Sequence, residues 1–346
     1  MYRCLQLAAF GGGHVAPNPM VGAVVVHNHQ IIGEGFHQRY GEAHAEPHAI
    51  LSVKDEALLQ ESTLYVNLEP CSHMGKTPPC AQFIVDKKIP KVVIGTLDPN
   101  PKVSGRGIKI LQDAGIEVVT NVLENECRRL NKRFFTLHNE NRPFILLKWA
   151  ETRDGFIDII RHDADTPPLQ ISGPIAKQIT HKIRSENQAI MVSTNTAILD
   201  NPSLTTKHWP GKNPIRIILD RTGRIPEDYN IFNGMAKTLI FTENPRENTE
   251  STEYIYLHFE EHMLNNLLQI LTSKDIHSVL VEGGAQLLNN LIDTGLWDEA
   301  LTEVSDQVIG QGVQAPSINI APHSSVTINN HLHLKYINRN KKFSSL

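Results

Sequence analysis

The chain has 346 residues, four cysteines, a formal net charge of −4 and an isoelectric point near 6.5. Its length favours two domains, and its slightly acidic balance argues against a nucleic-acid partner, which would need a broad basic surface. No apolar run reaches the roughly eighteen residues of a membrane span, so we expect no membrane partner. The first residues lack the apolar core of a signal peptide, and the cysteines are too few for a disulfide framework. These features predict a protein of the reducing cytoplasm.

The first part of the chain alternates between short helices and strands, as in an α/β domain. Residues 3–10 have apolar side chains at helical spacing, and three consecutive glycines end that helix. Two β-rich runs at 20–26 and 30–36, joined by a polar turn, predict a hairpin. Beyond the hairpin we expect strands at 63–68, 91–96 and 117–119, and helices at 46–53, from 80 onward, at 108–114 and at 123–137.

A polar segment ending in Pro143 predicts a joint between domains, so we place the first domain at 1–141 and the second at 142–346. The alternating pattern then begins again, with Ser172 as the expected N-cap of a helix. Further strands are expected at 144–148, 189–192, 215–219, 238–241, 254–257 and 278–281, and helices at 262–272 and 285–294. The polar segment 323–346 is rich in asparagine and lysine, and we expect it to be partly disordered.

One motif in the first half indicates a specific chemistry. His44-Ala45-Glu46 is followed by Pro70-Cys71 and, after a longer spacer, by Cys80. One imidazole and two thiols suit a zinc ion with three protein ligands, which leaves a fourth position for water, as in catalytic sites. Zinc brings the pKa of a bound water close to neutrality, and this order of residues is the signature of zinc deaminases. Glu46 would carry a proton from the water to the departing ammonia and would not be needed to hold zinc.

Other interpretations of single residues remain open. His48 lies four residues after His44 and would share its helix face, so it is an alternative metal ligand. Pro47 fits the first turn of a helix that begins here, which favours a packing role for His48. Each cysteine or histidine taken alone is more often an ordinary buried residue. In the second half, Val281-Glu282-Gly283-Gly284 joins a strand to a helix, and such a junction either holds a phosphate on its backbone N–H groups or packs tightly.

The residues around the zinc motif resemble one family closely, the bifunctional deaminase/reductase of bacterial riboflavin biosynthesis, and the likeness extends over nearly the whole chain. In the first half it rests on Pro17-Asn18-Pro19-Met20-Val21-Gly22, His44-Ala45-Glu46, Leu68-Glu69-Pro70-Cys71, Thr77-Pro78-Pro79-Cys80, Asp98-Pro99-Asn100-Pro101 and Gly105-Arg106-Gly107. In the second half it rests on Lys148, Asp154-Gly155, Asn195-Thr196, Asp200-Asn201-Pro202-Ser203-Leu204-Thr205 and Val281-Glu282-Gly283-Gly284.

The resemblance implies a cytidine-deaminase-like αβα sandwich followed by a dihydrofolate-reductase-like α/β domain. The first domain would use one zinc ion per chain to hydrolyse the exocyclic amine of 2,5-diamino-6-ribosylamino-4(3H)-pyrimidinone 5′-phosphate. The second would use NADPH to reduce the ribosyl group to a ribityl chain. The implied partners are thus small pyrimidine ribosylamine phosphates, and proteins of this kind often form homo-oligomers.

The resemblance also assigns roles to single positions. His44, Cys71 and Cys80 match the zinc ligands, and Glu46 matches the acid/base. The positions that match deaminase substrate contacts are Asn18, His37, His73, Lys76, Asp98 and Asn100. Those that match NADPH contacts are Ser172, Asn195, Thr196, Gly283 and Gly284, and those that match reductase substrate contacts are Lys148, Arg184, Asp200, Asn201, Leu204, Lys207 and Glu282. The departures from the common pattern are Phe156 (usually lysine), Ser193 (usually glycine) and Lys207 (usually arginine), and they all fall in the reductase half.

Two rival functions are compatible with the zinc motif. In the first, the chain is a zinc deaminase of a free base or nucleoside, and its second half is a non-catalytic domain for oligomerisation or docking. In the second, zinc is a structural staple of a non-enzymatic protein, which would require a fourth protein ligand in place of water. Lys76 and the phosphate-suited junction at Gly283-Gly284 favour the bifunctional enzyme over both rivals.

Overall fold

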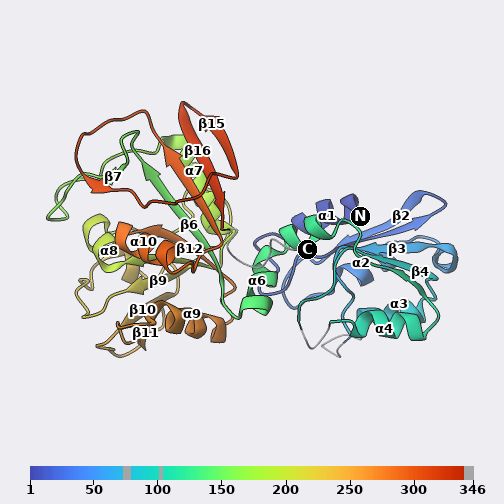
Figure 1. Ribbon diagram of the computed structural model, residues 1–346. Helices are drawn as coiled ribbons and strands as arrows, with labels where there is room; N and C mark the ends of the chain where they lie inside the picture. The colour runs from blue at the N-terminus through green and yellow to red at the C-terminus, as the bar shows by residue number, and fades with distance from the viewer. Residues whose placement is uncertain (73–78, 101–103, 339–346) are drawn as a thin grey trace. The chain divides into compact units, whose positions relative to one another are not determined.

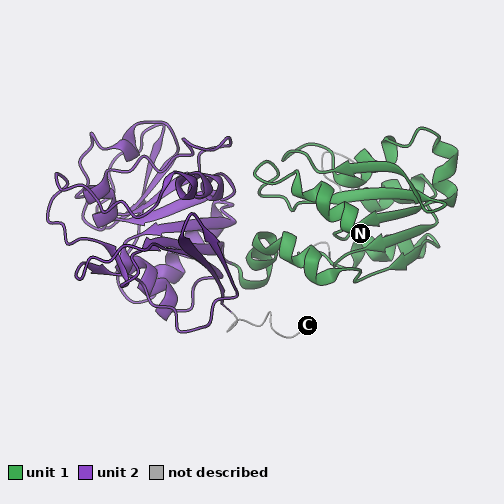
Figure 2. Cartoon of the chain, turned by 90° about the horizontal axis from the view of Figure 1, so that it is seen from above, with its two compact units in different colours: residues 1–141 green, residues 142–346 purple. Residues whose placement is uncertain are grey.

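The computed structural model describes residues 1–72, 79–100 and 104–338, and the chain divides into two compact units, Met1–Asn141 and Arg142–Leu346 (Figure 1; Figure 2). Each unit has its own main sheet and its own hydrophobic core. Among the helices of the described residues, none has the length and apolar character that crossing a bilayer requires.

The first unit is built on a five-stranded sheet in the order β2-β1-β3-β4-β5. Strand β1 is antiparallel to both neighbours, whereas β3, β4 and β5 are parallel to one another. The strands are β1 (Gly22–His27), β2 (Gln30–Phe36), β3 (Thr63–Val66), β4 (Lys91–Ile94) and β5 (Glu117–Val119). The helices are α1 (Tyr2–Ala9), α2 (Ala45–Leu51), the 3₁₀ helix η1 (Glu56–Glu61), α3 (Cys80–Asp86), α4 (Arg106–Asp113), α5 (Glu124–Leu130) and α6 (Lys132–Glu140).

Helices cover both faces of this sheet. Successive residues of a strand point to opposite faces, so a strand buried on both sides has no polar alternation. Ala23 and Val25 of β1 belong to the core that α2, α3 and α4 share with the sheet. Val24, which lies between them, packs instead against Cys4 and Leu7 of α1. The first unit is therefore an αβα sandwich, as the resemblance implied.

The helix predicted at 123–137 is wrong in one respect, because it is broken into α5 and α6 at Asn131. The Asn131 side chain is buried, and its amide bonds both backbone groups of Met20, accepting from the N–H at 2.8 Å and donating to the carbonyl at 2.9 Å. Because Met20 lies just before β1, these bonds fix the loop that carries Asn18. Helical spacing along the sequence gives no sign of such a tertiary contact.

The second unit is built on a nine-stranded sheet in the order β11-β10-β9-β8-β12-β6-β13-β16-β15. All strands from β11 to β13 in this order are parallel, and β16 and β15 complete the sheet as an antiparallel pair. The strands are β6 (Phe144–Glu151), β8 (Ala189–Ser193), β9 (Ile215–Leu219), β10 (Thr238–Thr242), β11 (Thr252–Tyr256), β12 (Ser278–Gly283), β13 (Glu299–Val304), β15 (Ser324–Ile328) and β16 (His331–Ile337). The helices are α7 (Pro174–Ser185), α8 (Thr194–Asp200), the 3₁₀ helix η2 (Asn230–Phe232), α9 (Met263–Ser273) and α10 (Ala285–Asp293), and β7 (Phe156–Asp158) pairs with β14 (Val313–Gln314).

Two clusters of buried apolar side chains lie on the two faces of this sheet. Ile145 and Leu147 of β6 belong to one cluster, and Phe144 and Leu146 to the other. Parallel strands that are buried on both faces have continuous apolar sequences, which is why β6, β8, β9, β10, β11 and β12 were predicted to within a few residues. The parallel strand β13 was not predicted, because polar residues interrupt its apolar run. The α/β class expected for the second unit is confirmed.

Two expectations for the second unit are wrong. The segment 323–346 was expected to be partly disordered, but residues 324–337 contain β15 and β16, and β16 pairs with β13. Residues 339–346 lie outside the described residues. Polar and apolar residues alternate from His331 to Leu334, as in a strand, but the asparagine and lysine content of the segment hides this pattern. Ser172 is also not the N-cap of α7. Gly173 has that position, and the Ser172 hydroxyl donates to Glu303 at 2.5 Å.

Candidate functional site

Three side chains from three elements of the first unit form a metal-binding group. His44 is the N-cap residue of α2, Cys71 lies in the loop after β3, and Cys80 is the first residue of α3. The His44 Nδ1 atom lies 3.6 Å from the Cys71 sulfur and 3.3 Å from the Cys80 sulfur. Ligand atoms of a tetrahedral zinc site with ordinary Zn–S and Zn–N bond lengths are about 3.6 Å apart. The spacing of the group therefore fits a zinc ion.

The described residues contain no fourth ligand for this group. The ligand atoms of His44, Cys71 and Cys80 all lie within 4.8 Å of one another, and no other described His, Cys, Asp or Glu belongs to this group. The alternative ligand His48 is 3.4 Å from the amide of Gln38 through its Nδ1 atom. Three ligands correspond to a site with an open position rather than to a closed structural site.

The electrostatics of the group suit a divalent cation. The backbone N–H of Cys80 donates to the Cys71 sulfur at 3.3 Å. Hydrogen bonds with the Cys80 thiol and with the His44 imidazole together lower the pKa of Cys71 to about 4, against the effect of burial. The same pairing, together with burial, raises the pKa of Cys80. One proton is thus shared between the thiols, and zinc, which binds thiolates, would take its place.

Glu46 lies in the first turn of α2, two residues after the His44 ligand. Its side chain is only 3% exposed, and its Oε2 atom has no hydrogen-bond partner among the described residues. Burial raises the pKa of Glu46 to about 7, and the negative charge of Cys71 adds to this effect. A buried carboxyl group with this pKa can take up and release a proton at neutral pH, as a general acid/base must.

Asn18 and His37 lie beside the metal-binding group. The His37 ring is 5.3 Å from the His44 ring, its Nδ1 atom is 3.0 Å from the Ala43 carbonyl oxygen, and its Nε2 atom is 3.1 Å from the Asn18 amide nitrogen. Because the carbonyl can only accept, His37 carries its proton on Nδ1 and accepts from Asn18 on Nε2. Burial lowers the pKa of His37, which favours this neutral form.

A second predicted pair of substrate contacts, Asp98 and Asn100, lies in the loop after β4 and is held by Glu69, a residue that sequence reasoning missed. The Asn100 N–H donates to Asp98 at 2.7 Å. The buried Glu69 carboxylate accepts from the backbone N–H groups of Asp98, Gly105, Gly107 and Ile108 at 3.0 to 3.4 Å. The motif around Cys71 includes Glu69, but nothing local to it signals these contacts. The remaining predicted contacts, His73 and Lys76, lie outside the described residues.

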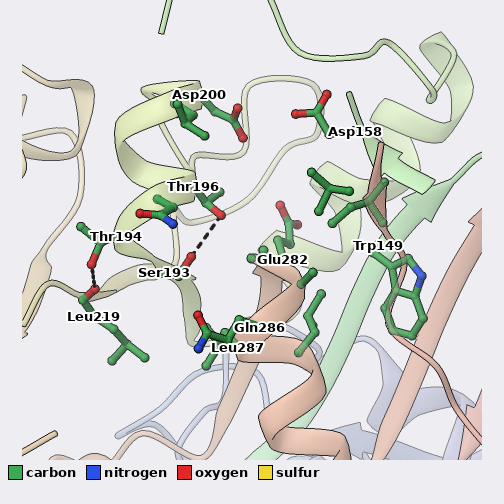
Figure 3. A pocket seen from close by; sticks show the side chains of 18 of the residues that line it. Trp149, Asp158, Ser193, Thr194, Thr196, Asp200, Leu219, Glu282, Gln286 and Leu287 are labelled. Atoms are coloured by element: carbon green, nitrogen blue, oxygen red, sulfur yellow. Dashed lines mark hydrogen bonds between the residues drawn. The ribbon is translucent and has the colours of Figure 1, made fainter. Parts of the chain in front are cut away.

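The second unit contains a cavity of about 950 Å³ at the carboxyl ends of β6, β8, β9 and β12. Figure 3 shows Ser193, Thr196 and Glu282 of different elements around it. The predicted reductase residues that line the cavity are Ser172, Asn195, Thr196, Asp200, Glu282, Gly283 and Gly284. Crevices at the carboxyl ends of parallel strands, where helices begin, are the usual ligand sites of open α/β sheets.

The Gly283-Gly284 junction packs tightly against the start of α8. A Cβ atom on Gly283 would lie 2.9 Å from the Thr196 side chain, and one on Gly284 would lie 2.3 Å from the Ser193 hydroxyl. Gly284 also has a φ of +71°, which favours glycine. The junction is therefore tightly packed, which is one of the two roles that the sequence allowed for it. Because neither residue has a side chain, the backbone of the junction lines the cavity.

Charged side chains adjoin the cavity on one side. Arg184 binds Glu282 with its Nη2 atom 2.5 Å and its Nε atom 3.1 Å from the carboxylate. Burial alone would raise the pKa of Glu282, but the positive charges of Arg184 and Lys148 lower it. Burial lowers the pKa of Lys148, against the effect of Glu282 and Glu303. These groups form an ordered cluster of charges beside the cavity, which they reach through Glu282.

Five of the predicted reductase residues do not line the cavity within the described part of the chain. Lys148 and Arg184 lie behind Glu282, whereas the other three have no link to the cavity through it. Leu204 is buried in a hydrophobic cluster with a φ of +52°. Asn201 accepts bonds from both nitrogen atoms of Asn230. Lys207 is exposed. Their assignment therefore rests on the resemblance.

Sequence reasoning also missed three arginines that line the cavity. Arg161 forms an ion pair with Asp158 at 2.6 Å and another with Asp200, so it ties the Asp200 carboxylate in place. Arg221 and Arg224 directly follow β9. Because β9 was predicted correctly and ligand sites lie at the carboxyl ends of parallel strands, these two arginines could have been predicted as cavity residues. Nothing in the sequence around Arg161 indicates its partners.

Comparison with known proteins gives matches over both units. Residues 1–96 match the family model of the cytidine and deoxycytidylate deaminase zinc-binding region, and residues 143–335 match that of the RibD C-terminal domain. The riboflavin biosynthesis protein RibD of Aquifex aeolicus is 37% identical over 325 residues, which cover 92% of this chain and 90% of that protein. RibD of Bacillus amyloliquefaciens is 39% identical over 327 residues, with 92% and 86% covered.

Solved structures agree with these matches. A diaminohydroxyphosphoribosylaminopyrimidine deaminase/5-amino-6-(5-phosphoribosylamino)uracil reductase from Thermotoga maritima has a TM-score of 0.85 and 36% identity, and the match covers 97% of this chain and 96% of that one. Acinetobacter baumannii RibD also has a TM-score of 0.85, with 31% identity and 97% of both chains covered. The chain therefore belongs to the RibD family of riboflavin biosynthesis proteins, and the deaminase joined to a reductase that its motifs indicated is confirmed.

Proposed function

We propose that residues 1–141 hydrolyse the exocyclic amine of 2,5-diamino-6-ribosylamino-4(3H)-pyrimidinone 5′-phosphate, and that residues 142–346 use NADPH to reduce the ribosyl group of the product to a ribityl chain. The deaminase and reductase activities of the Thermotoga maritima relative support both steps. The observation that carries the proposal is Glu46, a buried carboxyl group with an unpartnered oxygen next to a His-Cys-Cys metal group.

His44, Cys71 and Cys80 would hold the zinc ion, since their donor atoms have the chemistry and spacing that zinc requires. When bound there, zinc supplies a water that ionises near neutral pH. Glu46 holds the transferred proton on Oε2 and delivers it to the departing amine, which leaves as ammonia. Its raised pKa suits both halves of this transfer at one pH.

The side chains around Glu46 orient the pyrimidine. Neutral His37 accepts a hydrogen bond from the Asn18 amide nitrogen and so fixes that nitrogen toward the imidazole ring. The Asn18 oxygen is then available to accept a hydrogen bond from a pyrimidine N–H. Asp98 and Asn100 lie on the loop held by Glu69, and we assign them, with His73 and Lys76, to the substrate. In this assignment Lys76 meets the phosphate.

In the second unit the cavity holds NADPH against the sugar of the substrate. Asn195, Thr196 and the open backbone at Gly283-Gly284 form the cofactor side. Glu282 and Asp200 form the substrate side, and Lys148 and Arg184 support Glu282 from behind. The assignment of Asn201, Leu204 and Lys207 to the substrate rests on the resemblance alone. The cofactor supplies the hydride, and these residues align it with the reacting carbon and exclude water.

The cavity argues against a deaminase with a non-catalytic second domain, because seven residues matched to a reductase converge on it. The three-ligand group argues against a structural zinc staple. We further propose that the protein works in the cytoplasm, since its four cysteines are free thiols, and that it forms homo-oligomers, as the resemblance suggests.

The test is one assay of zinc-loaded protein with the diaminopyrimidinone ribosylamine phosphate, in which ammonia release and NADPH oxidation are followed together. E46Q should retain zinc and lose ammonia release, because glutamine cannot carry the proton. NADPH oxidation should then return when the deaminated intermediate is supplied. E61Q, which alters an exposed glutamate of the same unit, is the matched control. Deamination by E46Q at the wild-type rate would overturn the role of Glu46, and ammonia release without NADPH oxidation would overturn the reductase assignment.

A further inference from the structure

A row of charged and polar side chains crosses the sheet of the second unit beyond the predicted substrate residues. Lys148 on β6 lies opposite Leu301 of β13, so Glu303, two residues later, points to the same face of the sheet. On the other side of β13, Glu303 lies opposite His333 of β16. The proposed site contains Lys148, whereas the resemblance gives no role to Glu303.

Glu303 is a buried carboxylate with two short hydrogen bonds. Its side chain is 3% exposed. The Ser172 hydroxyl donates to its Oε2 atom at 2.5 Å, and the His331 Nδ1 atom lies 2.6 Å from its Oε1 atom. A carboxylate has only acceptor atoms, so both partners donate to it. Each oxygen of Glu303 is thus committed to one donor.

This arrangement determines what Ser172 can offer to a ligand. A hydroxyl group has a single proton and two lone pairs, and the Ser172 proton is directed at Glu303. Ser172 also lines the cavity, together with Trp149 and Gly284. The side of its oxygen that remains for the cavity can therefore only accept a hydrogen bond. Without Glu303 the hydroxyl would rotate freely and could donate as well.

We propose that Glu303, held by His331, is a positioning residue of the reductase cavity that makes Ser172 a hydrogen-bond acceptor for a neutral donor group of the ligand. The inference rests on the proposed reductase function and adds a specificity element to it. Of the groups of the proposed ligands that carry such donors, those next to the reacting atoms are the carboxamide of the nicotinamide ring and the hydroxyl groups of the sugar chain. Both present the same chemistry to Ser172, and experiment separates them.

The experiment uses the full zinc-loaded protein and the variants S172A, E303M and the double variant. In the cofactor arm, the Kd values of NADP⁺ and of its 3-acetylpyridine analogue, in which a methyl group replaces the amide NH₂, are measured by titration. In the substrate arm, the KM of the deaminated intermediate is measured by NADPH oxidation. E299M is the matched control, because Glu299 is a buried glutamate on the same strand that pairs with Lys335. Thermal unfolding checks that each variant is folded.

If Ser172 accepts from the carboxamide, wild-type protein should bind the analogue about fivefold more weakly than NADP⁺, and S172A should bind the two equally. If it accepts from the sugar, S172A should raise the KM about fivefold and leave both Kd values unchanged. In the arm that responds, E303M should weaken binding by a smaller factor than S172A, because the freed hydroxyl can still accept a hydrogen bond. It should have no effect in the S172A background. E299M should behave as wild type.

Unchanged Kd and KM values for S172A would overturn the inference. An E303M effect of equal size with and without Ser172 would also overturn it, since the role of Glu303 would then be purely structural. If E303M does not fold, the comparison of S172A with wild type still decides whether Ser172 accepts. A wild-type protein that binds NADP⁺ but shows none of these differences overturns this inference alone. A wild-type protein that neither binds NADP⁺ nor oxidises NADPH overturns the proposed function as well.

Discussion

Replacing Glu69 with glutamine tests whether one buried carboxylate holds the loop that carries Asp98. Glu69 is 4% exposed, and its two oxygens accept bonds from four backbone N–H groups, those of Asp98, Gly105, Gly107 and Ile108. Glutamine keeps one acceptor oxygen but directs an NH₂ group at the donors of the other. The variant therefore removes hydrogen bonds and leaves buried N–H groups without an acceptor.

The size of the effect follows from the two shorter bonds. Gly105 donates to Oε2 at 3.1 Å and Gly107 to Oε1 at 3.0 Å, so the amide loses one of them whichever way it turns. A hydrogen bond to a charged group contributes about 1.5–3 kcal/mol, and an unsatisfied buried donor costs about 1–3 kcal/mol. We expect E69Q to lower the free energy of unfolding of the first unit by about 3 kcal/mol, and its Tm by roughly 9 °C.

Calorimetry of the zinc-loaded protein measures the Tm, and the ammonia assay measures the deaminase KM. The KM of the E69Q variant should rise, because the loop that carries Asp98 and Asn100 is held less firmly. Reductase activity with the deaminated intermediate should not change. E117Q, which alters an exposed glutamate paired with Lys91, is the control. A Tm within 2 °C of wild type, beside an unchanged KM, would refute the claim that Glu69 holds the loop.

Three further predictions concern the core, the pH dependence and the metal. L267A, at a fully buried position of α9, should lower the free energy of unfolding of the second unit by about 3 kcal/mol in urea titrations, whereas L332A at an exposed position should change it by less than about 0.5 kcal/mol. The folded-state pKa of Glu282 lies below its ordinary value of 4.5, so its ionised form stabilises the second unit above that pH, and the stabilisation is lost as the pH falls through the folded-state pKa. E282Q should therefore reduce the loss of stability as the pH falls below about 4.5, and an unchanged slope in that range would contradict the assignment. Removal of zinc by a chelator should abolish ammonia release but leave NADPH oxidation with the deaminated intermediate intact, and a parallel loss of both would show that the metal supports more than the deaminase.

Local sequence predicted most of the fold because most elements here are determined locally. The strand at Ile215–Leu219 was predicted at its observed bounds, since a short apolar run between polar segments has few other solutions. The break at Asn131 and the strand at His331–Ile337 escaped prediction for a different reason. Asn131 bonds to Met20, far away in the sequence, and β16 exists because β13 offers it a partner.

The same distinction applies to the candidate site. His44, Cys71 and Cys80 were found because metal ligands must be particular residue types at a recognisable spacing, and the structure brings them together. Glu69 and Glu303 are ordinary glutamates in the sequence. Their importance comes from burial beside donors contributed by distant segments, and no pattern of spacing records such partners.

The position of β6 in the sheet has a consequence for biosynthesis. β6 is the first strand of the second unit to be synthesised, yet it lies between β12 and β13, which follow near the end of the chain. The strands of the first unit all precede it. A ribosome-bound chain can thus contain a finished deaminase while the central strand of the reductase still lacks both neighbours. During that interval β6 needs protection from aggregation, so the reductase half depends more on chaperones and on the speed of translation than the deaminase half.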